Sequence, residues 1–339
     1  MTPESRATFT DPRPLGPSPP THNPPMNPIS VLLIFLGVFA VGYLYVFITG
    51  LMRDAREGQT LAPKPLMGLV SFIANFFDTL GVGSYATTTS MVRFFKLMPD
   101  EKIPGSLNVG YTLPTIIQAY VTIHGVSGLG VTVPPVEVDP FTLITLIAAA
   151  ILGAWLGAGV VSKWPRRKIQ LGMGFCLAAA AIIMLIRLTV FHSLEVGATG
   201  LTGGKWVIGM VGMFGLGALM TLGIGLYAPC LILVTLLGMN DKSGYPIMMG
   251  ACAFLMPVAV IRFVRARAYY PPAMLAMAIP GMLAVPLAFK WFQNLDMKWV
   301  KIVVIFVVAY AAITMLLTAY RERGTEAATR TASLEGASA

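Results

Sequence analysis

A glycine-rich octapeptide occurs twice in this chain and holds the residues best suited to bind a ligand. TLGVGSYA covers 79–86, and TLGIGLYA covers 221–228, 142 positions further along, with six of eight residues identical. Each copy lies in a long apolar segment, at 66–97 and 206–239. As one helix, each segment would measure about 48 Å, against about 30 Å of bilayer hydrocarbon. Because glycine removes the Cβ restriction on the backbone, we expect two half-helices joined by an unwound turn in each.

The N-termini of the two outgoing half-helices are suited to an anion. Their unpaired N–H groups and positive dipole ends attract negative charge, and small hydroxyls beside them bind oxyanion oxygens without adding charge. The candidate binding residues of the two turns are Gly81, Gly83, Ser84, Tyr85, Thr87, Thr88, Gly223, Gly225, Tyr227 and Pro229. In the alternative interpretation the hydroxyls bond to carbonyls of their own helix and the glycines only permit close packing. Packing is what we expect of Gly153 and Gly157, which are spaced as GxxxG in an ordinary span.

Asp78 is the only acidic residue well inside an apolar segment. A carboxylate there is costly unless it is paired, hydrated or functional. The position 142 residues later holds Met220, so the repeat does not require an acid. Two roles stay open: Asp78 takes up and releases a proton as part of the protein's function, or it accepts N–H bonds at the turn.

Other polar residues in the spans are weaker candidates. Asn75 and Asn108 are candidates to line the site, and ordinary bonds between helices explain them equally well. Tyr111 and Gln118 are also polar and within spans, without an assigned role. The cysteines lack CxxC spacing, the histidines are scattered, and no metal or cofactor site is expected from either set: Cys176, Cys230, Cys252, His22, His124 and His192.

The composition excludes a soluble domain. Of 339 residues, 56% are apolar and only 12% are charged, which is typical of a polytopic membrane protein. Nine apolar segments are expected, at 30–51, 66–97, 104–123, 140–162, 169–191, 206–239, 244–264, 272–289 and 300–319. The net charge of +9 gathers in short loops, so it indicates topology rather than nucleic-acid binding.

Charge then favours one topology. If the two interrupted segments are re-entrant hairpins, each repeat has three full spans, and the odd number gives the repeats opposite orientations. The basic loops at 163–168 and 262–267 then share the cytoplasmic side, whereas full crossings would separate them. The expected fold is all-α, with one extra helix before two inverted repeats. Its parts are a disordered proline-rich tail (1–29), a first transmembrane helix (30–51), repeat A (66–192), repeat B (206–320) and a disordered cytoplasmic tail (321–339).

Three stretches carry a resemblance to a known family: FFDTLGVGSYA from Phe76, LGIGLYAPC from Leu222, and LGAWLGA followed by a Lys/Arg loop. Together they resemble the TauE/SafE family of sulfite exporters and anion permeases over about 30–320. In place of the family's usual adjacent glycines and proline, the first turn has Ser84 and Thr87, and the second has Leu226 before Pro229.

The resemblance implies a secondary transporter of sulfite, an organosulfonate or a related small anion in the bacterial inner membrane. It implies no enzymatic activity. The expected partners are the small anion and the lipid bilayer, with no nucleic acid, and a homodimer is left open. A passive anion channel of the same fold is the main alternative, followed by an intramembrane enzyme and by an assembly subunit that does not transport.

Overall fold

The computed structural model describes residues 27–81, 83–128, 131–157, 197–220 and 225–293, with single positions between 171 and 186 and between 302 and 320. Residues 1–26 and 321–339, and most of the spans expected at 169–191 and 300–319, lie outside the described residues. The described part is helical apart from one short ladder of two strands. The prediction of an all-α membrane fold is confirmed.

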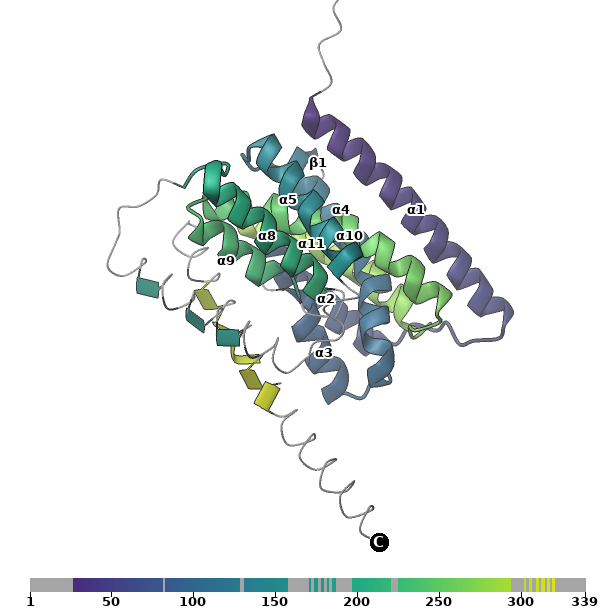
Figure 1. Ribbon diagram of the computed structural model, residues 1–339. Coiled ribbons are helices and arrows are strands. Elements are labelled where there is room, and N and C mark those ends of the chain that lie inside the picture. The colour runs from purple at the N-terminus through teal and green to yellow at the C-terminus, as the bar shows by residue number, and fades with distance from the viewer. Residues whose placement is uncertain are drawn as a thin grey trace, which may run out of the picture.

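Helix α1 (Pro28–Arg56) is the extra helix before the repeats, and it begins inside the tail expected at 1–29. The Asn27 side chain accepts the N–H of Ile29 at 3.1 Å, which caps the helix. Figure 1 shows α1 running along one side of the bundle. There it packs against α4 (Ile103–His124) and α10 (Gly244–Arg265).

The remaining helices follow the same order in both halves of the chain. The first half has α2 (Pro65–Thr79), α3 (Ser84–Phe94), a 3-10 turn η1 (Asp100–Lys102), α4 and α5 (Pro140–Leu152). The second half has α8 (Gly203–Met220), α9 (Tyr227–Leu236), a 3-10 turn η3 (Asp241–Ser243), α10 and α11 (Ala273–Gln293). Pro114 in α4 and Pro257 in α10 lie at similar places. The sequence repeat is therefore also a repeat of elements.

Two irregular pieces were not expected from the sequence. Strands β1 (Val126–Gly128) and β2 (Val131–Val133) form an antiparallel ladder within the loop after α4. The α5 segment ends in one π-helical turn, Gly153–Gly157. A Cβ added to Gly153 would overlap the backbone of Phe214 in α8, which explains why a glycine is needed at this crossing.

Each interrupted segment turns back on itself. Lys64 Nζ, just before α2, donates to the carbonyl of Leu97, just after α3, at 3.0 Å, so the two ends of this hairpin lie side by side. We call α2 and α3 hairpin A. Helices α8 and α9 form hairpin B, because the N–H of Ala198, before α8, donates to Gly238 O, after α9, at 3.0 Å.

The two hairpins open toward opposite ends of the α4 and α10 pair. At the base of hairpin A, Lys102 Nζ donates to Arg267 O, just beyond the end of α10, at 2.6 Å. At the base of hairpin B, Ser243 Oγ donates to Glu137 O, in the loop that follows α4, at 2.7 Å. Helix α2 of hairpin A packs against α11 of the second half, and α8 of hairpin B packs against α5 of the first half. Each hairpin is therefore in contact with a helix of the other half. An inverted repeat requires this geometry, and the side of the membrane that each end faces stays a prediction.

The end of α1 is fixed by buried charge. Tyr269 donates to the buried carboxylate of Asp54, which Arg53 also contacts at 3.2 Å. Burial, together with the Asp54 carboxylate, raises the pKa of Tyr269, so this phenol stays protonated and donates. Arg267 forms a bidentate ion pair with Glu57 at 2.6 Å. These contacts hold α1 against the loop between α10 and α11.

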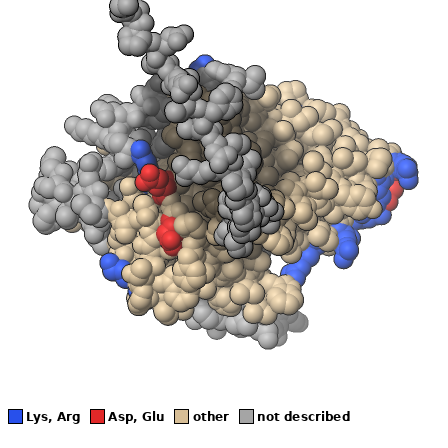
Figure 2. All heavy atoms as spheres, turned by 90° about the horizontal axis from the view of Figure 1, so that it is seen from above, with Lys and Arg blue, Asp and Glu red and all other residues tan. Residues whose placement is uncertain are grey.

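The outer surface suits a bilayer. Within the described part of the chain, four helices are long and apolar enough to cross a membrane: Pro28–Arg56, Gly203–Met220, Gly244–Arg265 and Ala273–Trp291. In Figure 2 most of the visible face is uncharged, and Lys and Arg lie near its margins. This distribution is the one expected of a multi-pass membrane protein.

Candidate anion-binding site

The break in hairpin A is built around a buried carboxylate. Leu80 ends α2, and Gly81 and Gly83 then take positive φ angles of 97° and 79°. This turn brings the first N–H of α3, that of Ser84, to Asp78 Oδ1 at 2.5 Å. Asp78 is only 2% exposed, so its charge is held at the positive end of α3 rather than by water. The role of N–H acceptor, one of the two left open for Asp78, is therefore present in the structure.

Gln118 in α4 joins the two hairpins. Its Nε2 donates to Asp78 Oδ2 at 3.2 Å and to Thr79 Oγ1 at 2.9 Å. Its Oε1 accepts from the hydroxyl of Tyr227, the first residue of α9, at 2.8 Å. A single buried amide thus connects the end of α2 with the start of α9.

The two breaks face each other in a reciprocal way. A Cβ placed on Gly83 would lie 3.9 Å from Tyr227 Cβ, and a Cβ on Gly225 would lie 4.0 Å from Tyr85 Cβ. Because each glycine is 142 positions from the other, and so is each tyrosine, the two contacts correspond under the sequence repeat. The turns that were predicted as one site from sequence are therefore neighbours in space.

Three buried polar atoms near these turns have no hydrogen-bond partner among the described residues: Asn75 Oδ1, Tyr85 Oη and Thr87 Oγ1. Unpaired polar atoms in a protein interior are rare, and each one calls for a water, an ion or a ligand. Tyr85 is only 6% exposed, which makes its free phenol the clearest case. The structure thus offers hydrogen-bonding capacity at the breaks that the protein itself does not use.

The other candidate residues divide into three groups. Thr88 Oγ1 is 2.8 Å from the hydroxyl of Tyr111 in α4, and Gly81 packs against Tyr245 in α10. Thr88 and Gly81 therefore lie where hairpin A packs against these two helices. Pro229 is the third residue of α9 and removes one N–H from its first turn. Gly223 lies outside the described residues.

Asn75 and Asn108 behave differently from each other. The Asn75 amide donates to Ser71 O at 2.9 Å and leaves its own oxygen free. Asn108 donates to Pro104 O of its own helix at 2.9 Å. It lies ten residues before Gln118, or about 15 Å along α4. Asn75 therefore lies within hairpin A, one helical turn before the break, whereas Asn108 lies in α4, away from Gln118.

The sequence analysis gave Asp78 a possible role but noted Gln118 only as a polar residue within a span. An amide inside an apolar span, four residues after Pro114, was a signal that could have found it. Tyr245 was missed as well, although its hydroxyl donates to Leu80 O at 3.0 Å and so satisfies a carbonyl at the break. Both contacts join positions far apart in the chain, which a local pattern does not indicate.

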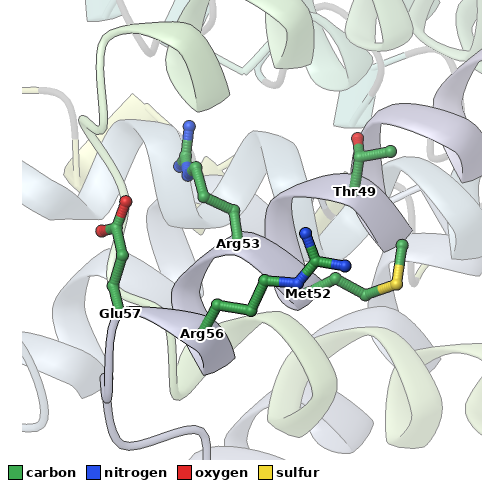
Figure 3. A pocket seen from close by; sticks show the side chains of 5 residues that line it. All are labelled: Thr49, Met52, Arg53, Arg56 and Glu57. Atoms are coloured by element: carbon green, nitrogen blue, oxygen red, sulfur yellow. The ribbon is translucent and has the colours of Figure 1, made fainter.

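A cavity of about 340 Å³ lies elsewhere, at the end of α1, and Figure 3 shows its lining. Its lining residues are Thr49, Met52, Arg53, Arg56 and Glu57. Arg53 and Glu57 are already engaged with Asp54 and Arg267, and no residue of either hairpin takes part. We therefore place the candidate site at the breaks. Within the described residues, no three His, Cys, Asp or Glu side chains lie together in a way that could hold a metal ion.

A duplicated helical bundle with two broken hairpins meeting at its centre defines a class of multi-pass membrane protein that is suited to transport. The chain belongs to the sulfite exporter TauE/SafE family, whose model matches residues 136–315. This match includes hairpin B, α10 and α11. It begins at residue 136, so hairpin A lies before it. No curated protein and no solved structure matched the chain. Membership assigns the chain to a family of membrane transporters rather than enzymes.

Proposed function

We propose that this protein is a secondary transporter of a small anion, such as sulfite, an organosulfonate or a related sulfur anion, with its binding site at the two helix breaks. The observation that carries the proposal is the buried, unpartnered phenol of Tyr85, beside two facing turns of which one already holds a carboxylate. The Asp78 carboxylate is held by neutral N–H donors, with no ion pair to it among the described residues. Because neutral donors bind an anion less tightly than a fixed positive charge would, such a site suits a ligand that must also be released. The bacterial inner membrane is the expected location.

Counterflow in proteoliposomes tests this function. Vesicles loaded with unlabelled anion should accumulate labelled sulfite, taurine or sulfoacetate, because a carrier exchanges its ligand across the membrane. Uptake should saturate with concentration, whereas a passive channel would show no acceleration by the anion inside. Folded protein that exchanges none of a panel of sulfite, sulfate, thiosulfate, taurine and sulfoacetate would refute the proposed substrate class.

Asp78 is our candidate for proton coupling. Its ionisable neighbours are Tyr85 in α3, Tyr111 in α4, Tyr227 in α9 and Cys252 in α10, and none of them is basic. A proton on Asp78 would remove the acceptor that Gln118 Nε2 now uses, so protonation would change the link to hairpin B. Proton uptake by Asp78 would in this way change hydrogen bonds in both hairpins.

Asp78→Asn should retain exchange and lose its dependence on a pH gradient. Asparagine keeps an oxygen for the Ser84 N–H but does not titrate, so the rate should be the same with and without the gradient. Asp54→Asn is the matched control, because Asp54 is also buried but lies at the end of α1. Acceleration of Asp78→Asn by the gradient, as large as that of the parent protein, would exclude the coupling role.

A further inference from the structure

The two breaks share a repeated sequence but not the same polar groups. In hairpin A, Asp78 Oδ1 takes the N–H of Ser84, and Gln118 donates to the second oxygen. Under the repeat, Met220 stands in place of Asp78, and Leu226 stands in place of Ser84. The α10 positions that correspond to Gln118, 141 to 143 residues later, are all apolar: Ala259, Val260 and Ile261. Hairpin B thus also has a helix that begins at its break, but the corresponding positions carry neither the carboxylate nor the amide.

The first N–H groups of α9 are candidate donors for an anion. Its first internal bond runs from Cys230 N to Leu226 O at 2.9 Å, so the N–H groups of Leu226, Tyr227 and Ala228 have no acceptor within the helix. Leu226 supplies no side-chain cap. Met220 Sδ lies 3.6 Å from Cys252 Sγ, so the position that corresponds to Asp78 is occupied by uncharged sulfur groups.

Tyr85 supplies the second, independent observation. Its Cβ lies 4.0 Å from the Cβ position of Gly225, directly before the cap of α9, and its phenol has no partner although it is 94% buried, being 6% exposed. The corresponding phenol, that of Tyr227, is bound by Gln118 at 2.8 Å. Tyr85 therefore lacks a partner such as Gln118, which binds its counterpart Tyr227. Hairpin B likewise lacks a carboxylate at Met220, the position that corresponds to Asp78.

We infer that a small monovalent oxyanion binds at the N-terminus of α9, in the place that the Asp78 carboxylate takes at α3, with the Tyr85 phenol as a donor. This inference rests on the proposed function and specifies its site. Asp78 shows what the geometry accepts: two oxygens on one centre, held by neutral N–H donors. Carboxylates, sulfonates and hydrogen sulfite share that feature. A divalent anion such as sulfate is disfavoured, because no cationic group accompanies the buried carboxylate among the described contacts.

Met220→Asp tests the inference by giving hairpin B its own carboxylate. A tethered anion at this position competes with free ligand at a high effective concentration, so the affinity for methanesulfonate should fall by about tenfold or more. Met220→Asn is the matched control, because asparagine has nearly the shape of aspartate without its charge. It should bind methanesulfonate with an affinity within about threefold of that of the parent. Isothermal titration of purified, full-length protein with methanesulfonate, acetate and sulfate measures the parent and both substitutions at Met220.

Tyr85→Phe is the second variant and decides the question if Met220→Asp does not fold. The phenol has no hydrogen bond to lose, so this change should leave the melting temperature unchanged while it weakens methanesulfonate binding. Equal affinity of Tyr85→Phe and the parent, or no binding of methanesulfonate or acetate by the parent, would overturn the inference. Binding without counterflow would refute the proposed function alone, and counterflow unaffected by these changes would refute the site alone.

Discussion

Gln118→Leu is expected to abolish transport and to destabilise the fold. Leucine fills a similar volume but removes the partners of Asp78 Oδ2 and of the Tyr227 hydroxyl, both of which are buried. Each buried polar group left without a partner costs about 1–3 kcal/mol, so the loss should reach about 2–6 kcal/mol. The two hairpins would also lose the bond that connects them.

Thermal unfolding in detergent, together with counterflow, measures both effects. Thr122→Val is the matched control, because Thr122 is also buried in α4, one turn further on. Its hydroxyl donates only to Gln118 O and Ala119 O of its own helix, so its loss should change stability by less than about 1 kcal/mol. If Gln118→Leu melted and transported like Thr122→Val, the amide would be a packing residue and not a link.

The position of Gln118 explains how one titrating group in hairpin A is able to affect both halves. The hydrogen bonds described for Asp78 go to Ser84 of its own hairpin and to Gln118, whereas Gln118 also bonds to Tyr227. An amide presents a donor on one side and an acceptor on the other, so a change of donor and acceptor at Asp78 requires an opposite change at Tyr227. The proposed coupling thus needs no basic residue near Asp78.

The hairpins could be predicted from sequence because their signals are local. Segments too long for one span, a repeated pair of glycines and the charge of the flanking loops together favoured re-entrant turns, and Lys64 with Leu97 now shows the turn in hairpin A. Element boundaries were also close: α10 ends at Arg265, where a span was expected to end at 264.

The internal chemistry of the site could not be predicted, because it depends on contacts between distant positions. Gln118 meets Asp78 across 40 residues and Tyr227 across 109, and no spacing rule connects them. Asn108 has the same amide as Asn75, but in the structure it donates to Pro104 O of its own helix, and its role at the site stays a prediction. Residue type identified the candidates, and only the packing of α4 against both hairpins separated them.

The difference between the two breaks also has a local physical cause. Gly83 has φ 79° and ψ 116°, which L-residues with a side chain avoid, and this angle turns the chain so that Asp78 reaches Ser84. Gly225 has no such positive φ. The carboxylate and the positive-φ glycine thus occur together in hairpin A, whereas the corresponding described positions of hairpin B, Met220 and Gly225, have neither.

Gly83→Ala should therefore be far more harmful than Gly225→Ala, although the added methyl groups meet nearly the same surroundings. Within 4 Å, the new Cβ would contact only Tyr227 Cβ at 3.9 Å in the first variant and only Tyr85 Cβ at 4.0 Å in the second. Crowding is thus equal and mild, and backbone strain is the difference between them. We expect Gly83→Ala to lose about 1–3 kcal/mol of stability and Gly225→Ala to lose less than about 1 kcal/mol.

The measurement is the melting temperature of both variants and the parent, purified in the same detergent. A second comparison separates strain from the loss of the Asp78 contact: Gly83→Ala made in the Asp78→Asn background should cost nearly as much, because the φ angle is imposed by the turn and not by the charge. Equal melting temperatures for Gly83→Ala and Gly225→Ala would mean that the turn of hairpin A relaxes freely. The Asp78 carboxylate would then be held at α3 by its own hydrogen bonds, to Ser84 and Gln118, and not by the shape of the break.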